Sequence, residues 1–301
     1  MNHKLVKKRL ALYLLLTFGL TWIPTIIFTA NGGKYESGAM DFILTYGMLC
    51  PGIAVLITHL LTKEGYGVNG RGFLQLGIDL GKGKWKWYLF AMIVPILYMD
   101  LGAALMYLLF PKCFNPDMLE IYGVTKDTLW MYPVVGITST VMLSIGALGE
   151  ELGWRGYMIP KLEELFGIKK AIIIGGIIWG IWHYPMNYAG HNFGTGYWGE
   201  PWSGFFVFTV YTVFVGALLV FVTKKTDSIW PATFLHAVNN SGANMLSAYY
   251  DRQRLTGIWS ESVVSALIQM VPVFILGIIA IVIMCSDKES PLLKDKSLSV
   301  V

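Results

Sequence analysis

The sequence has few charged residues and few cysteines. Of its 301 residues, 14% are charged and 55% are hydrophobic, and the mean hydropathy is +0.56. This composition excludes an ordinary soluble domain, in which about a quarter of the residues are charged. The three cysteines, Cys50, Cys113 and Cys285, are too few and too scattered for a disulfide framework or a cysteine zinc cluster. We therefore expect buried or interfacial structural thiols.

The sequence contains several long apolar segments with few charged residues. A membrane-spanning helix needs roughly 20 mostly apolar residues. Eight segments approach this length, near residues 10–30, 40–61, 87–110, 132–157, 168–188, 203–222, 229–249 and 263–284. The sequence thus predicts an all-α, polytopic membrane protein, a bundle of about eight transmembrane helices. We expect one integral membrane domain over residues 1–286, with a motif-bearing core at 132–249, and a disordered cytoplasmic tail over 287–301.

The distribution of lysine and arginine predicts the orientation, because cytoplasmic loops carry an excess of both. Eight spans with an inside N-terminus place all 23 basic residues in cytoplasmic segments except Lys34, Lys112, Lys126, Arg252 and Arg254. Both termini are therefore expected in the cytoplasm, with the helices in the cell membrane. The net charge of +4 then reflects topology and contact with anionic membrane lipids, and no nucleic-acid binding is expected. The glycine- and lysine-rich segment between the second and third spans is expected to lie along the cytoplasmic interface.

Inserting an ionisable side chain into the membrane costs at least about 2.5–3.5 kcal/mol, so each such residue in a predicted span calls for a structural or functional explanation. Three clusters stand out: Glu150, Glu151 and Arg155 in GEELGWR, Trp179 and His183 in WGIWH, and His236 and Asn240 in HAVNN. Residues four apart share a helical face. This spacing predicts an ion pair between Glu151 and Arg155, which leaves Glu150 unpaired and suited to act as a general base.

The remaining clusters supply groups for hydrolysis. Two histidines, an amide donor and a carboxylate that can take a proton are the components for activating water against a carbonyl, with or without a metal. Two histidines and a carboxylate can also hold zinc with one open position, although the helical zinc-protease signature of two histidines four apart is absent. The alternative is a set of interhelical hydrogen bonds, worth about 0.6 kcal/mol each on average. An unpaired acid beside a matched pair argues against that alternative for the whole set.

The three motifs, in this order, resemble those of the CPBP intramembrane proteases, the CAAX-protease and bacteriocin-processing (Abi) family. The one departure is Trp179, where phenylalanine is commoner. The resemblance implies a CAAX prenyl protease-like endopeptidase with its active site inside the bundle. It implies that Glu150 and His183 activate the water, and that His236 and Asn240 stabilise the oxyanion or complete the site. Supporting roles fall to Glu151, Arg155 and Trp179.

Several alternatives stay open at this point. The family has been described both as a metalloprotease group, for which His183 and His236 would bind zinc, and as metal-free. The substrate is expected to be a peptide or a membrane-protein segment, lipidated or not, cleaved near the cytoplasmic half of the bilayer. A non-catalytic immunity or scaffold protein of the same fold is a second hypothesis, and a proton-coupled transporter using Glu150 is a third. At 1.5 Å per residue, His183 falls about 10 Å nearer the outer face than the other clusters. Helix tilt, a later start of this helix, or a break near Gly175 and Gly176 would close this gap.

Overall fold

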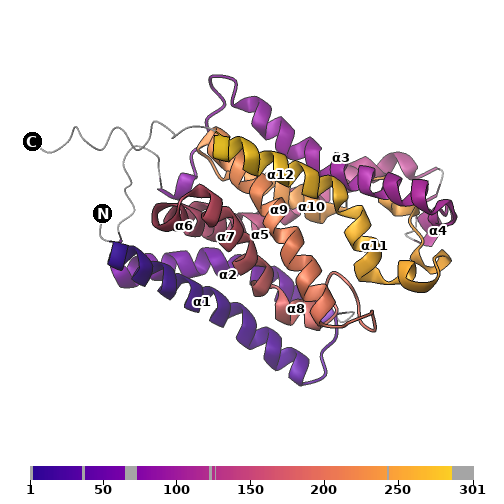
Figure 1. Ribbon diagram of the computed structural model, residues 1–301, viewed down its shortest axis with the longest axis horizontal. Coiled ribbons are helices and arrows are strands. Elements are labelled where there is room, and N and C mark those ends of the chain that lie inside the picture. The colour runs from indigo at the N-terminus through magenta and orange to yellow at the C-terminus, as the bar shows by residue number, and fades with distance from the viewer. Residues whose placement is uncertain are drawn as a thin grey trace, which may run out of the picture.

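The protein is all-helical over the residues that the computed structural model describes, which are 3–35, 38–64, 73–121, 124–125, 127–242 and 244–286. The predicted fold class is confirmed (Figure 1). The helices are α1 (His3–Ala30), α2 (Gly38–Thr62), α3 (Trp85–Leu109), α4 (Met118–Ile121), α5 (Tyr132–Gly153), α6 (Ile159–Phe166), α7 (Ile168–Trp182), α8 (Tyr184–Tyr188), α9 (Trp202–Thr226), α10 (Trp230–Ser241), α11 (Ser262–Gln269) and α12 (Val271–Ser286). The predicted tail, 287–301, lies outside the described residues, and the division into one membrane domain and a tail stays a prediction.

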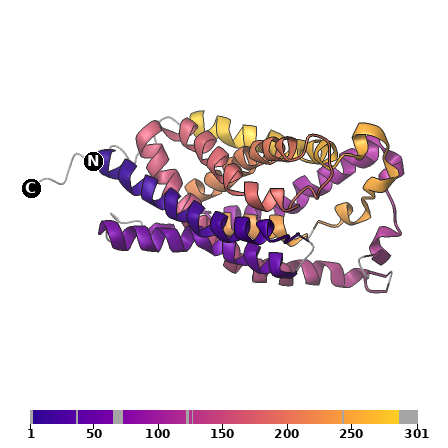
Figure 2. The same cartoon turned by 90° about the horizontal axis from the view of Figure 1, so that it is seen from below.

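The long helices run along a common direction, so the bundle has two ends (Figures 1 and 2). At one end α1 begins and α2 ends, where the Nε of Arg9 lies 3.7 Å from the Glu64 carboxylate and Lys161 of α6 lies 2.7 Å from it. The start of α3 meets the end of α9 there, because Lys84 donates to the Thr226 carbonyl at 3.0 Å. We call this the basic end, since the helix termini here carry Lys4, Lys7, Lys8, Arg9, Lys82, Lys84, Lys86, Lys161, Lys169, Lys170, Lys224 and Lys225.

The opposite, distal end contains the end of α1, the start of α2 and the loop after α8. The Tyr35 amide, just beyond α1, donates to the Ala189 carbonyl at 3.1 Å. The same end holds the connection after α3, where the Asp251 amide donates to the Cys113 carbonyl at 2.9 Å. The basic residues of these distal segments are Lys34, Lys112, Arg252 and Arg254.

The number of complete spans is lower than the sequence predicts. Among the described residues, five helical segments are long and apolar enough to cross a membrane, with α5 continuing through α6 as one span. The pair α11 and α12, bent by 49°, would make a sixth. The other two expected spans are short, because α7 has 15 residues and α10 has 12. The predicted count of eight is therefore not confirmed. The protein is nonetheless a multi-pass membrane protein.

Close helix contacts fix the elements that carry the polar clusters. A Cβ on Gly149 of α5 would lie 2.7 Å from the Met48 carbonyl oxygen of α2, and one on Gly176 of α7 would lie 2.5 Å from the Val213 Cα of α9. Only glycine permits such approach, and small residues are the usual means of bringing membrane helices together. These contacts fix α5 on α2 and α7 on α9.

Part of the segment before α3, which is expected along the cytoplasmic interface, packs on the bundle. Residues 65–72 fall outside the described part of the chain, but the residues that follow dock on the bundle at its basic end. The Ile229 amide donates to the Gln75 carbonyl at 3.0 Å, and the Trp230 indole donates to the Leu76 carbonyl at 2.8 Å. Beyond this contact, Ile78 and Leu80 are exposed, as an interfacial segment requires.

The three cysteines are free, and Cys50 and Cys113 are buried while Cys285 is half-buried. Their positions agree with the expectation of buried or interfacial thiols.

Candidate active site

The two glutamates lie where α5 changes its winding. Trp154–Met158 form a π-helical turn, and the Trp154 amide donates to the carbonyls of both Glu150 and Glu151. Such turns are rare and often occur at functional sites. The wider turn changes the direction in which the neighbouring side chains point. Glu150, Glu151 and Arg155 are all buried, with exposed fractions of 2%, 0% and 3%. The polar side chains of GEELGWR are thus enclosed in the bundle.

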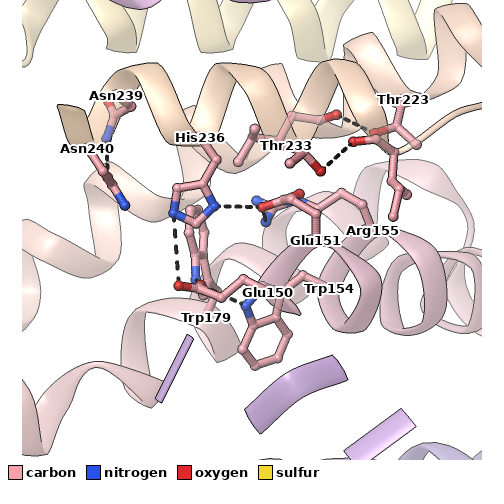
Figure 3. Close-up of polar contacts among 12 residues, drawn as sticks. Glu150, Glu151, Trp154, Arg155, Trp179, Thr223, Thr233, His236, Asn239 and Asn240 are labelled. Carbon is pink, nitrogen blue, oxygen red and sulfur yellow. Dashed lines mark hydrogen bonds and ion pairs between the residues drawn. The ribbon is translucent and has the colours of Figure 1, made fainter. Parts of the chain in front are cut away.

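The predicted ion pair is present and has a third member. Arg155 Nη1 donates to Glu151 Oε1 at 2.8 Å, and His236 Nδ1 of α10 donates to the same oxygen at 2.9 Å (Figure 3). The guanidinium also lies over the Trp179 ring, 4.3 Å from its centroid. Glu151 therefore joins α5 to α10 and fixes which nitrogen of His236 faces away from it.

The expectation that Glu150 lacks a partner is wrong. Its Oε2 accepts the indole N–H of Trp179 at 2.8 Å and that of Trp154 at 3.1 Å, as Figure 3 shows. Its Oε1 lies 3.9 Å from His236 Nε2. The indoles are neutral donors, which a search for charge pairs does not count. One carboxylate oxygen is therefore anchored, and the other remains available for chemistry.

His183 stands at a break in the chain between α7 and α8. Its Nδ1 donates to the Trp179 carbonyl at 2.8 Å, which leaves Nε2 as the nitrogen that can accept a proton. A break near Gly175 and Gly176, one of the three ways of bringing His183 closer, is not what the structure shows, because α7 runs through both residues to Trp182. The helix ends at His183, two residues before Pro185, whose ring cannot continue it without losing a hydrogen bond.

The three clusters meet at one cavity. It has a volume of about 600 Å³, and its lining includes Glu150, His183, His236 and Asn240. Both imidazoles pack edge-on against Trp179, with ring centroids 5.8 Å away for His183 and 5.5 Å away for His236. The separation of His183 from the other clusters, expected from counting residues, does not keep it out of the cavity.

A network that the sequence did not reveal lies beside Asn240. Tyr98 of α3 and Tyr211 of α9 both donate their hydroxyls to Asn239 Oδ1, the latter at 2.7 Å. Asn239 Nδ2 then donates to Asn240 Oδ1 at 3.1 Å (Figure 3). This chain of hydrogen bonds leaves the Asn240 amide nitrogen as the free donor toward the cavity. The only signal in the sequence was the first asparagine of HAVNN, Asn239, directly before the predicted Asn240.

The residues present do not fit a zinc site. A catalytic zinc ion takes three protein ligands and keeps one open position. Within the described residues no group of three or more His, Cys, Asp or Glu side chains is placed to hold a metal ion. The Nδ1 atoms of His236 and His183 are bonded to Glu151 and to the backbone, so only their two Nε2 atoms face the cavity, one ligand fewer than a catalytic zinc site takes from histidine and carboxylate groups placed together.

Comparison with known proteins agrees with this geometry. Residues 131–242, which contain all three clusters, match the family described as type II CAAX prenyl endopeptidase Rce1-like. The chain is also similar to "CAAX prenyl protease 2" of Methanococcus maripaludis, with 24% identity over 255 residues that cover 82% of this chain and 89% of the relative. Both matches agree with the resemblance of the three motifs to those of the CPBP family of CAAX proteases. They support an endopeptidase function for the chain.

Proposed function

We propose that this protein is an intramembrane endopeptidase whose water is activated by Glu150 and His183. The observation that carries the proposal is the convergence of Glu150, His183, His236 and Asn240 from three helical segments on one cavity. Buried ionisable groups that line a cavity inside a membrane protein mark functional sites. The roles of the individual residues are part of the proposal.

Glu150 is suited to serve as the general base. Its Oε2 is held by two indole N–H groups, so Oε1 can take a proton from a water in the cavity while the carboxylate keeps its orientation. His183 orients that water through Nε2, because its other nitrogen is fixed by the Trp179 carbonyl. The water oxygen then attacks the scissile carbonyl carbon, and the proton held by Glu150 passes to the leaving amine.

Asn240 and His236 are suited to stabilise the oxyanion. The Asn239 amide occupies the Asn240 side-chain oxygen, which leaves the Asn240 N–H₂ to donate to a developing negative charge. His236 donates through Nδ1 to Glu151, so it is in the imidazolium form that its Nε2, on the Glu150 side, can donate to the oxyanion. Glu151, Arg155 and Trp179 support these groups by hydrogen bonding and packing.

We propose as substrate a peptide or membrane-protein segment, free or lipidated, with membrane lipids as the surroundings. The name of the archaeal relative makes a prenylated C-terminal peptide a suitable first probe. We also propose residence in the cell membrane with the basic end in the cytoplasm, because lysine and arginine accumulate there.

The direct test compares purified wild-type protein with Glu150→Gln and His183→Ala in proteoliposomes, using an internally quenched peptide. Glu150→Gln keeps an acceptor for the indoles but cannot take a proton, so activity should fall by about 10²–10⁴-fold. Lys169→Ala, at an exposed position on α7, is the matched control and should retain full activity. A fully active, folded Glu150→Gln protein would refute the proposal and would favour a scaffold or immunity role. A proton-coupled transporter would instead show proton-dependent uptake that Glu150→Gln abolishes.

A further inference from the structure

The active-site cavity is open at the distal end of the bundle. Four of its lining residues are exposed: Asp41 and Thr45 in the first two turns of α2, Asn192 in the loop after α8, and Asn240 near the end of α10. Asp41 and Asn192 belong to distal segments, since α2 begins there and the neighbouring Tyr35 and Ala189 are hydrogen-bonded. The accessible rim of the cavity is therefore built from the distal part of the bundle.

The same cavity is closed toward the basic end. Beyond Glu150 lie Glu151, Trp154 and Arg155, which are 0%, 1% and 3% exposed. The docked residues Leu74–Leu76 cover this region, and the Leu74 carbonyl lies 3.0 Å from the position of a Cβ on Gly156. None of the described residues in 73–84, 154–170 or 219–231 lines the cavity. The described residues on this side therefore leave no opening into the cavity.

The distribution of charge assigns the two ends to the two sides of the membrane. Twelve lysine or arginine positions named above mark the basic end, and Lys34, Lys112, Arg252 and Arg254 mark the described distal segments. Because short cytoplasmic loops carry the excess of lysine and arginine, the basic end faces the cytoplasm. The open rim consequently faces the opposite side.

We propose that the substrate is a polypeptide segment presented on the non-cytoplasmic side of the membrane, which enters the cavity between α2, α10 and the loop after α8. This inference rests on the proposed peptidase function and names its substrate class. It adds the side of approach to the expected cleavage within the bilayer, and the peptide bond is cleaved at the depth of Glu150.

The depth of the cavity sets a length requirement for this segment. Gly149 lies against Met48 and Leu49, so Glu150 is nearly level with Leu49. Asp41 precedes Leu49 by eight residues, which corresponds to about 12 Å of helix. An extended chain advances about 3.3 Å per residue. The scissile bond therefore lies about four residues or more from any folded part of the substrate, as in a flexible terminus or loop.

Cysteine labelling in intact cells tests the sidedness. In a Cys285→Ser background, Thr45→Cys and Asn192→Cys introduce thiols at the rim, and Lys82→Cys and Lys169→Cys introduce exposed thiols at the basic end. We expect a membrane-impermeant maleimide to label the rim positions in intact cells and the basic-end positions only after permeabilisation. The reverse pattern would overturn the proposal. Cys50 and Cys113 are buried, and the background protein reports any labelling of them.

A second measurement links the rim to substrate entry. A bulky maleimide attached to Thr45→Cys from outside should lower kcat/KM for an added peptide at least 10-fold, whereas the same group on Lys169→Cys should leave it unchanged. Unchanged turnover after complete labelling at Thr45 would refute entry by this route. Peptides with fewer than four residues on either side of the cleaved bond, tethered to a folded domain, should not be cut. If no peptide is cleaved by unlabelled protein, the proposed function fails, whereas the labelling pattern still decides which side the cavity faces.

Discussion

Replacement of Arg155 by alanine probes the buried ion pair that joins the site to α10. The Arg155 side chain is 3% exposed, donates to Glu151 Oε1 at 2.8 Å and lies over Trp179. Removing one partner of a buried pair costs about 3–5 kcal/mol, because the other charge is left uncompensated. A free-energy change of 1.36 kcal/mol corresponds to a tenfold change in an equilibrium constant. The equilibrium constant for unfolding should therefore rise by roughly two to three and a half orders of magnitude.

The effect on catalysis should be much smaller than the effect on stability. The bond from His236 Nδ1 to Glu151 Oε1 is independent of Arg155, so His236 keeps its place in the folded variant. We expect kcat/KM of folded Arg155→Ala protein to stay within about 10-fold of wild type, far above that of Glu150→Gln. This difference separates a supporting residue from one that touches the reacting atoms.

Reversible unfolding in mixed micelles, followed by tryptophan fluorescence, gives the free energy of unfolding. Lys224→Ala is the matched control, since Lys224 and Glu163 form an ion pair of 2.7 Å whose side chains are each 35% exposed. An exposed pair contributes about 0–1 kcal/mol. If Arg155→Ala costs no more than Lys224→Ala, the assignment of Arg155 to a buried structural pair is refuted.

Three further predictions follow from contacts around the site. Tyr211→Phe removes one of two hydroxyls that donate to Asn239, so kcat should fall about 10-fold with little change in KM, as steady-state kinetics would show. Gly149→Ala places a Cβ 2.7 Å from the Met48 carbonyl oxygen, and should lower the free energy of unfolding by about 1–3 kcal/mol. Burial raises the pKa of Glu64, but Lys161, Tyr157 and Arg9 outweigh it and hold that pKa below its usual value. Because the folded-state pKa lies below the unfolded value, Glu64 stabilises the fold above about pH 4.3, and this contribution is lost as the pH falls through the folded-state pKa.

The first two of these predictions have a control within the chain, and the third has a pH titration that tests it. Tyr184→Phe removes a hydroxyl that contacts Thr209 outside the cavity lining and should leave kcat unchanged. Gly19→Ala adds a Cβ that meets nothing within 4 Å and should not destabilise the protein. In unfolding titrations between pH 3 and 7, the stability difference between wild type and Glu64→Gln should shrink toward acid pH. A constant difference would contradict the role given to Glu64.

The clusters of the site could be found from the sequence because they depend on local helical geometry. Glu151 and Arg155 meet because residues four apart share a face, and the same spacing brings Trp179 beside His183. The Trp154 indole lies four residues from Glu150, so the same rule could have found this donor. The Trp179 indole could not be found in this way, because it reaches Glu150 from 29 positions along the chain.

The sequence by itself determined that the protein is a helical membrane protein with polar clusters enclosed in the bundle, because apolar length and the cost of burying charge are properties of local segments. Only the tertiary structure decided that α7 and α10 stop short beside the cavity, that Asn239 orients Asn240, and that residues 74–76 close the basic end. These features depend on contacts between segments far apart in the chain. The direction in which the cavity opens has the same origin, because its rim is assembled from α2, α10 and the loop after α8.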